Sequence, residues 1–377
     1  SAALFYIGGE IAIKLDDLDG ANKLFIKAIE IDKKNEEYRN KQQTLKNLKD
    51  LLTSARKTYD RGNFDEAIIE HEDIVKKYPK SALAYYSLGK IYKVNGEYDY
   101  AVKNYKKANE LNPFEAKYNK SIKAVSQEMA SNGDIEYRRR EFDLAIDYYK
   151  KAINYLPDYT TAIFKLARTY YKVKDLDNTK YYLELNLEID PNQEQSEKML
   201  GDIYRKNAEN DSAIIHYKKA IAINSNYSKA YYSLGTLFLK MGSLNEAKEN
   251  LNLAVLNDAE YIKAYGALGK VEQELGNADL AIKNYLNATS LDSKQYEIFY
   301  RLASIYNELK QYKDAKDSAK KCLNVKRNYA PAYFELGISE KALGNRVAAV
   351  DAFNKAKKDK DWRKSAQFEL EMLEKGL

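Results

Sequence analysis

Few side chains in this sequence have the chemistry of an enzyme active site. There are two histidines, His71 and His216, and one cysteine, Cys322. No His-Glu-x-x-His, Gly-x-Ser-x-Gly or Gly-x-Gly-x-x-Gly pattern surrounds them. A single cysteine excludes a disulfide framework and a cysteine-rich metal site. We predict no catalytic residues, no cofactor, no metal and no small-molecule substrate; we expect His71 and Cys322 to be packed inside the fold and His216 to lie at the surface.

One segment, residues 264–271, imitates a phosphate-binding loop through its Gly269-Lys270 pair. A functional loop needs glycine at its first position and Ser or Thr after the lysine. This chain has Ala264 and Val271 there. We therefore interpret Gly269 as a glycine needed for packing.

The composition limits the classes of protein that the chain can belong to. Hydrophobic residues make up 45%, charged residues 31%, and there are only 16 Gly and 5 Pro in 377 residues, which excludes a disordered chain and a β-sandwich. The net charge of +6 is small for a nucleic-acid binder. No apolar run is long enough to span a membrane, and residues 2–13 do not read as a signal peptide. We expect a soluble chain, either cytoplasmic or exported to the periplasm with its signal removed.

The sequence repeats itself. Residues 85–89, Tyr-Tyr-Ser-Leu-Gly, recur unchanged at 231–235, and anchoring on the last residue yields spacings of 46, 34, 44 and then 34 six times. The anchors are Gly9, Ala55, Gly89, Gly133, Ala167, Gly201, Gly235, Gly269, Ala303 and Gly337. Alanine stands twelve residues after the anchor in every repeat except the fifth, which has Thr179.

Within each repeat, the spacing between the recurring small and large residues places them on one face of a helix. Small residues lie seven apart with a large residue between them, as in Ala101, Tyr105 and Ala108. Small residues let two helices approach while the large one fills the gap. Each repeat is therefore predicted to be a helical hairpin, and prolines such as Pro79 and Pro113 fall where the second helix ends.

This pattern resembles the tetratricopeptide repeat (TPR). The third repeat shows it whole, as Tyr85, Leu88, Gly89, Tyr92, Gly96, Tyr98, Ala101, Tyr105, Ala108 and Pro113. The resemblance covers ten repeats and implies an all-α fold, a right-handed α-solenoid superhelix of TPR helical hairpins. It also implies a concave groove lined by the first helix of each hairpin.

Two long spacings suggest a division into blocks. The extra residues precede a first helix, and their apolar stripes predict long helices near 35–60 and 114–139, with a flexible loop as the alternative. We predict an N-terminal block of three repeats (1–112), a C-terminal block of seven (113–361) and a capping helix (362–377). The outer face of the first hairpin is expected to be uncovered, so self-association there is an alternative.

The resemblance also assigns five first-helix positions per repeat to the groove. In repeats three to seven, ten of these positions carry Lys or Arg and two carry Asp, whereas in repeats eight to ten the charges cancel. The candidate partner-binding residues are Tyr86, Lys90, Lys93, Tyr137, Arg138, Phe164, Arg168, Tyr171, Lys172, Lys198, Arg205, Lys206, Tyr232 and Lys240.

Cations beside aromatic rings suit an extended acidic segment. We therefore predict a non-enzymatic protein-protein interaction scaffold that binds an extended, acidic segment of a protein or peptide partner in a basic and aromatic concave groove. The alternative is a structural subunit of a bacterial envelope or secretion assembly that docks through the long helices and the N-terminal end; RNA binding is a weaker third. The asparagines of the family's two-carboxylate clamp are missing, since Lys90 and Asp134 occupy matching places.

Overall fold

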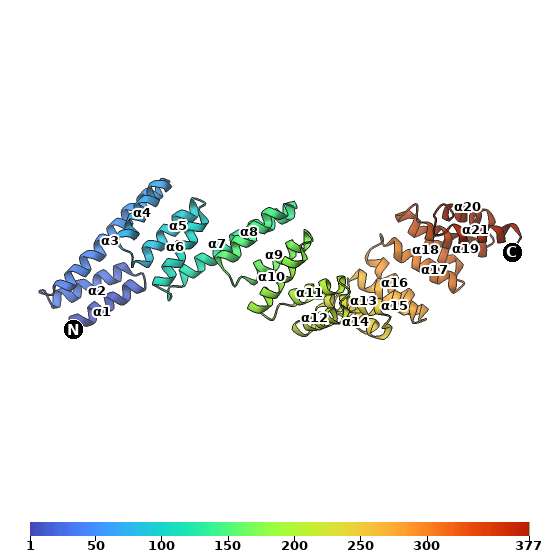
Figure 1. Cartoon of the computed structure of the whole chain (residues 1–377), viewed down its shortest axis with the longest axis horizontal. Helices are drawn as coiled ribbons and strands as arrows, with labels where there is room; N and C mark the ends of the chain where they lie inside the picture. Colours follow the sequence, from blue (N-terminus) through green and yellow to red (C-terminus); the bar gives the residue numbers. More distant parts are fainter. Residues whose placement is uncertain (377) are drawn as a thin grey trace. The chain divides into compact units, whose positions relative to one another are not determined.

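The chain is built from helices alone within the described residues, 1–376, of the computed structural model (Figure 1). They form two compact units, one of residues 1–189 and one that begins at Asp190. The helices of the first unit are α1 (Ala2–Lys14), α2 (Leu18–Ile31), α3 (Glu36–Asp60), α4 (Phe64–Lys77), α5 (Ala82–Val94), α6 (Tyr98–Leu111), α7 (Ala116–Arg139), α8 (Phe142–Tyr155), α9 (Thr160–Lys172) and α10 (Leu176–Ile189). Those of the second unit are α11 (Glu194–Lys206), α12 (Asn210–Ile223), α13 (Ser228–Met241), α14 (Leu244–Asn257), α15 (Ile262–Glu274), α16 (Ala278–Leu291), α17 (Tyr296–Glu308), α18 (Tyr312–Val325), α19 (Ala330–Ala342), α20 (Arg346–Ala356) and α21 (Arg363–Glu374).

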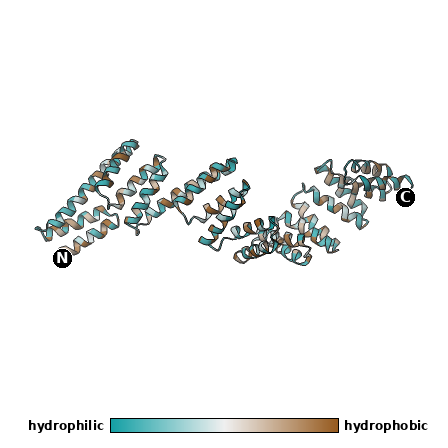
Figure 2. Cartoon of the chain, viewed as in Figure 1, coloured by the Kyte–Doolittle hydropathy of each residue, from teal (hydrophilic) through white to brown (hydrophobic). Residues whose placement is uncertain are grey.

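Successive helices pair as hairpins, and the anchor residue of the first helix faces a large side chain of the second. A Cβ placed on Gly269 would lie 2.5 Å from the ring of Tyr285, and one on Gly133 would lie 2.7 Å from Tyr149. The alanine column on the second helices is fully buried, as Ala281 illustrates. Figure 2 shows the resulting amphipathic helices. Hairpin packing therefore explains much of the tyrosine content and confirms that Gly269 is a packing glycine.

Each hairpin turns through a residue in the left-handed region, seven positions after the anchor. Glycine, which tolerates a positive φ at no steric cost, occupies this place in half of the hairpins, for example Gly96 with φ +81°. Elsewhere other residues adopt it, among them Asp16 with φ +57° and Arg140 with φ +68°. The chain therefore reverses direction at the same position of every hairpin.

Both long spacings are helical, which settles the alternative between helix and loop. Helix α3 has 25 residues and α7 has 24. The stripe of α3 serves two hairpins, because Leu45 packs with Phe25 of α2 while Leu48 packs with Ile74 of α4. The predicted boundary between blocks at residue 113 stays a prediction.

The two ends of the chain differ in how their apolar faces are covered. Helix α21 buries Ala366 and Leu370 in one cluster with Phe353, while Trp362 packs on Phe334 with ring centroids 5.0 Å apart. Helix α1 and its C-terminal cap residue instead expose a stripe of apolar side chains, namely Leu4, Ile7, Ile11 and Leu15. None of the described helices has the length and apolarity needed to cross a membrane.

Candidate partner-binding surface

In the first unit, the predicted positions on α5, α7 and α9 lie close together. Arg168 of α9 stacks on the ring of Tyr137 of α7, with the guanidinium carbon 4.8 Å from the ring centroid. Lys93 of α5 pairs with Glu128 of α7 at 3.1 Å. These contacts link α5 to α7 and α7 to α9. The nine candidates on these three helices are called here the α5–α9 surface, which comprises Tyr86, Lys90, Lys93, Tyr137, Arg138, Phe164, Arg168, Tyr171 and Lys172.

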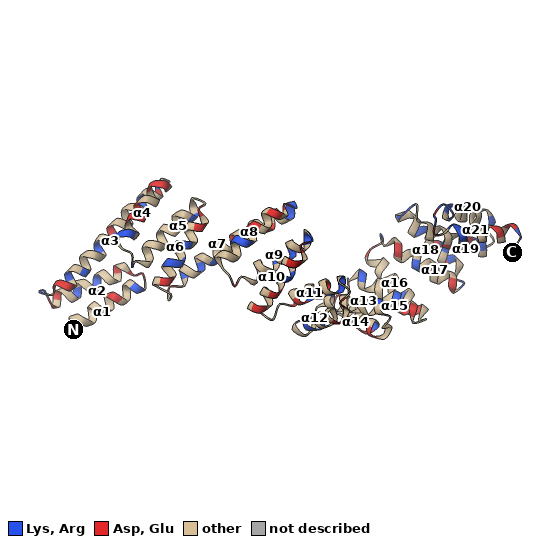
Figure 3. Ribbon diagram, viewed as in Figure 1, with Lys and Arg blue, Asp and Glu red and all other residues tan. Residues whose placement is uncertain are grey.

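The cations of the α5–α9 surface differ in how far they are available to a ligand. Arg138 and Lys172 are exposed, lie in the last turns of α7 and α9, and form no ion pair with any described residue. Figure 3 shows in blue the basic residues along these helices. Lys93 is half-buried, and Glu128 compensates its charge. Glu128 lies outside the five groove positions, so sequence reasoning missed this compensation.

Asp134 is the one acidic residue among the groove positions of α5, α7 and α9, and its charge is compensated. Lys165 donates to the carboxylate of Asp134 at 2.6 Å, and the Tyr149 hydroxyl donates to it at 2.7 Å. Burial alone would raise the pKa of Asp134, but these hydrogen bonds outweigh it and hold the pKa below its usual value. Lys165, another residue that the groove positions omit, thus preserves the positive character of the surface.

The second unit carries the remaining candidates on α11 and α13. Lys198 and Arg205 both approach the carboxylate of Asp202, at 2.6 and 3.9 Å, and Tyr217 donates to it at 2.8 Å. Tyr232 of α13 packs on Tyr261, with ring centroids 5.0 Å apart. The exposed candidates here are Arg205, Lys206 and Lys240. The basic character of α11 is therefore partly compensated within the helix.

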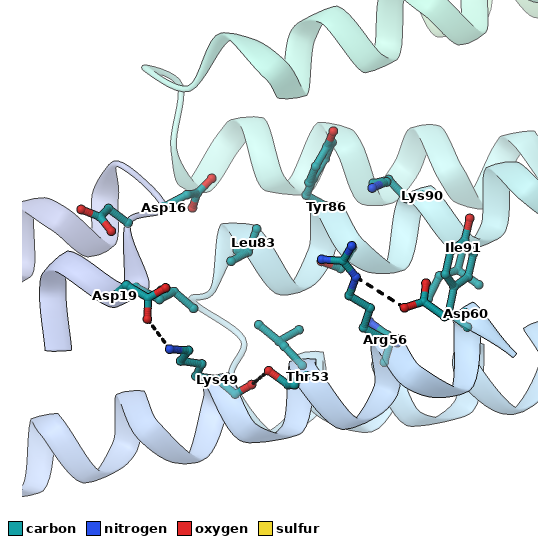
Figure 4. Close-up of a pocket in the computed structure, with 16 residues that line it drawn as sticks. Asp16, Asp19, Lys49, Thr53, Arg56, Asp60, Leu83, Tyr86, Lys90 and Ile91 are labelled. Atoms are coloured by element: carbon teal, nitrogen blue, oxygen red, sulfur yellow. Dashed lines mark hydrogen bonds and ion pairs between the residues drawn. The ribbon is translucent and has the colours of Figure 1, made fainter.

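A cavity of about 540 Å³ lies in the first unit, between the α1–α2 turn, α3 and α5 (Figure 4). Its α5 wall includes Tyr86 and Lys90, two of the candidates. Its α3 wall has six residues. Thr53 is one, and the other five stand at the five groove positions relative to anchor Ala55, namely Lys49, Leu52, Arg56, Tyr59 and Asp60. Applying the groove positions to the second repeat would have found this wall.

The histidines and the cysteine have structural surroundings. His71 is buried with Nδ1 2.8 Å from the Ala67 carbonyl oxygen, and burial lowers its pKa. Cys322 is fully buried, and burial raises its pKa to about 11, so it is confirmed as a packed thiol. His216 was expected at the surface, which is wrong: it is half-buried, stacked on Tyr204 and 2.6 Å from Glu197. Among the described residues, no group of three or more His, Cys, Asp or Glu side chains could hold a metal ion.

Comparison with known proteins identifies the class of this fold. Residues 82–115, 228–261, 262–295 and 296–329 match the tetratricopeptide repeat model, and residues 201–242 match a TPR repeat model. The chain therefore carries tetratricopeptide repeats, which in general build protein-protein interaction scaffolds.

Individual relatives resemble parts of the chain. The photosystem I assembly protein Ycf3 of Acaryochloris marina (strain MBIC 11017) is 34% identical over 103 residues, which are 26% of this chain and 58% of that protein. The chain thus matches little more than half of this relative's length. The C-terminal part of a TPR repeat-containing protein from Cytophaga hutchinsonii superposes with a TM-score of 0.52 at 16% identity, over 64% of this chain and 98% of that one. A MamA structure gives a TM-score of 0.42 at 26% identity, over 43% of this chain and 89% of that one. The Cytophaga structure supports the α-solenoid fold.

Proposed function

We propose that the chain is a scaffold that binds an extended acidic segment of a partner protein on the α5–α9 surface. The observation that carries this proposal is the arrangement around Tyr137. Arg168 covers its ring, while the neighbouring Arg138 and Lys172 project into solvent without a carboxylate partner among the described residues. Exposed cations next to aromatic faces attract acidic side chains and give apolar ones a surface to pack on.

Exposed charges contribute to such binding mainly through steering and moderate attraction. Each exposed pair is worth about 0.2–1 kcal/mol, and salt weakens it. Reversing two cations removes two attractions and adds two repulsions, which amounts to about 1.4 kcal/mol or more, a tenfold loss of affinity. Arg168 is left in place in the test because its half-buried stacking on Tyr137 is part of the packing.

The test compares R138E/K172E with wild type by affinity capture from a lysate of the source cells, followed by mass spectrometry. A matched control, K103E/K151E, makes the same charge change at exposed positions of second helices α6 and α8. We expect an acidic partner that wild type and the control retain and R138E/K172E loses. Equal capture by all three chains would remove the α5–α9 surface from consideration.

A second candidate function is that of a structural subunit that assembles through its N-terminal end. The exposed stripe of α1 favours it, with Leu4 70% and Ile11 52% exposed. Burial of this stripe against a second copy predicts a mass above the monomer in light scattering. The variant L4E/I11E should be monomeric, whereas L256E, at an exposed leucine of α14, should behave like wild type. A monomeric wild type at high concentration would exclude assembly through this face.

A further inference from the structure

A second cavity, of about 570 Å³, lies in the second unit between the C-terminal halves of helices α16 and α18 (Figure 1). It is called here the α16–α18 pocket. Phe299 of α17, which is 8% exposed, lines it together with Leu286 and Val325, which are 47% and 41% exposed. The volume is within the range of about 300–1,000 Å³ that ligand sites have. None of the lining residues stands at one of the five groove positions, so this pocket is separate from the predicted groove.

The eighth hairpin departs from the repeat pattern at three residues that line the pocket. Seventeen positions after the anchor, most hairpins carry a polar residue such as Glu184 or Lys218, whereas the eighth carries Leu286. Twenty positions after the anchor, most hairpins carry Ile, Leu or Val, whereas the eighth carries Thr289, which is shorter than Ile or Leu and more polar than Val. At the next position Ser290 replaces what is a longer side chain in nearly every other hairpin. Short side chains thus leave room where an exposed leucine extends the apolar lining, a combination typical of a binding site.

The charge at the pocket favours an anionic group beside an apolar one. Lys321 is the only charged residue of the lining, and its ammonium group lies 6.0 Å from the centroid of the Phe299 ring. Lys321 is exposed and forms no ion pair with any described residue. A carboxylate next to an apolar side chain therefore meets a complementary charge at this place, whereas a cation is repelled.

The uncharged polar residues of the lining favour a polypeptide over an acyl chain. The side-chain amide of Asn324 is exposed and forms no hydrogen bond with any described residue, and the same is true of the Ser293 hydroxyl. An amide side chain both donates and accepts hydrogen bonds, as the main chain of a protein segment does. An acyl chain offers neither a donor nor an acceptor to these groups.

We propose that the α16–α18 pocket binds a segment of a partner protein through an aromatic or large aliphatic side chain that stands next to a carboxylate. The apolar side chain packs on Phe299, Leu286 and Val325, and the carboxylate pairs with Lys321. This site goes beyond the proposed function, because it shares no residue with the α5–α9 surface and does not require that surface to have a partner.

The experiment uses the whole chain, immobilised, and three pools of nonapeptides that differ only in their two central residues, Phe-Glu, Ala-Glu or Phe-Gln. The other positions are random Ser, Gly, Thr and Asn, and both termini are capped. Mass spectrometry measures how much of each pool is retained. We expect the Phe-Glu pool to be retained about tenfold better than Ala-Glu, because a ring is buried, and about two- to fivefold better than Phe-Gln, because an exposed ion pair is gained.

A filled pocket should lose the preference for the apolar side chain. The variant T289L/S290E introduces the two residues that the fifth hairpin has at the same positions, Leu187 and Glu188, so the hairpin packing accommodates them. We expect it to retain Phe-Glu no better than Ala-Glu. The matched control V255L/L256E introduces the same two residues into the seventh hairpin and should bind like wild type.

The role of the cation is tested separately. K321Q should keep the preference for Phe over Ala and lose the preference for Glu over Gln. K320Q removes an exposed lysine that does not line the pocket and should keep both preferences. Loss of the Glu preference in K320Q but not in K321Q would contradict the assignment of the carboxylate to Lys321.

Several results would overturn the inference. They are equal retention of the Phe-Glu and Ala-Glu pools by wild type, no retention of any pool, or a Phe preference that T289L/S290E keeps. Loss of the Phe preference in R138E/K172E would assign the peptides to the α5–α9 surface instead, whereas failure of that variant to lose a partner from lysate would refute the proposed function alone. A dimer in light scattering that V255L/L256E keeps and T289L/S290E loses would mean that a second copy of the chain fills the pocket, contrary to the inference.

Discussion

Replacement of Gly269 by alanine tests how the hairpins are held together. The new methyl group would lie 2.5 Å from two ring carbons of Tyr285, a ring that is fully buried and cannot move aside. Inserting a methyl group into a packed core costs about 1–3 kcal/mol. Alanine also favours a helix over glycine by about 1 kcal/mol, so the two effects oppose each other.

Gly266, one turn earlier in α15, is the matched control. Its added methyl would lie 3.1 Å from Cδ1 of Ile298, the mobile end of a flexible side chain. Both substitutions gain the same helix propensity, which cancels in the comparison. We therefore expect G269A to be about 1–3 kcal/mol less stable than G266A. Urea unfolding followed by circular dichroism measures the difference.

A second substitution checks the cause. Leucine replaces tyrosine opposite Gly235 in the seventh hairpin, where Leu251 takes the place that Tyr285 has in the eighth. Y285L should therefore recover part of the stability lost in G269A, with a coupling of about 1 kcal/mol in the double-mutant cycle. Equal stability of G269A and G266A, or no coupling, would refute the packing argument.

Two further predictions concern buried carboxylates. Burial raises the pKa of Glu335 above its ordinary value of 4.5 despite a hydrogen bond from Asn307, so stability from this group falls as the pH rises through its folded-state pKa. E335Q should unfold at a higher urea concentration than wild type at pH 7 and at an equal one near pH 4; a pH-independent difference would contradict this. K248M should lower the free energy of unfolding by about 1–3 kcal/mol, because buried Glu272 would lose its ion pair with Lys248 and keep only its hydrogen bond from Asn277. An unchanged midpoint of urea unfolding would contradict this prediction.

Local patterns made the hairpins predictable from sequence. The spacing between Gly269 and Tyr285 recurs wherever a small anchor meets a large residue, and each contact lies within one repeat. Such pairs depend on the geometry of two adjacent helices and of the short turn between them. For the same reason the apolar stripe of α3 predicted its length.

The side of the cavity formed by the α1–α2 turn could not be predicted, because its position depends on contacts between distant residues. Asp16 and Tyr118 are 102 positions apart, and the hydrogen bond between them joins the α1–α2 turn to the start of α7. The ion pair between Lys93 and Glu128 was missed for a different reason. The five groove positions are defined only by their distance in sequence from the anchor residue, and this distance does not indicate ion pairs between helices. The prediction that His216 lies at the surface was wrong because Tyr204 and Glu197, which cover its ring, belong to the preceding helix, α11.

Site-specific photo-crosslinking tests the proposed surface most directly. A photoreactive phenylalanine analogue replaces Lys172 in one chain and, as control, exposed Lys103 of α6 in another. After irradiation in lysate, crosslinked peptides are sequenced by mass spectrometry. The account predicts that position 172 crosslinks to an acidic stretch of one partner and that position 103 does not. Crosslinks from position 103 alone, or to stretches without acidic residues, would contradict it.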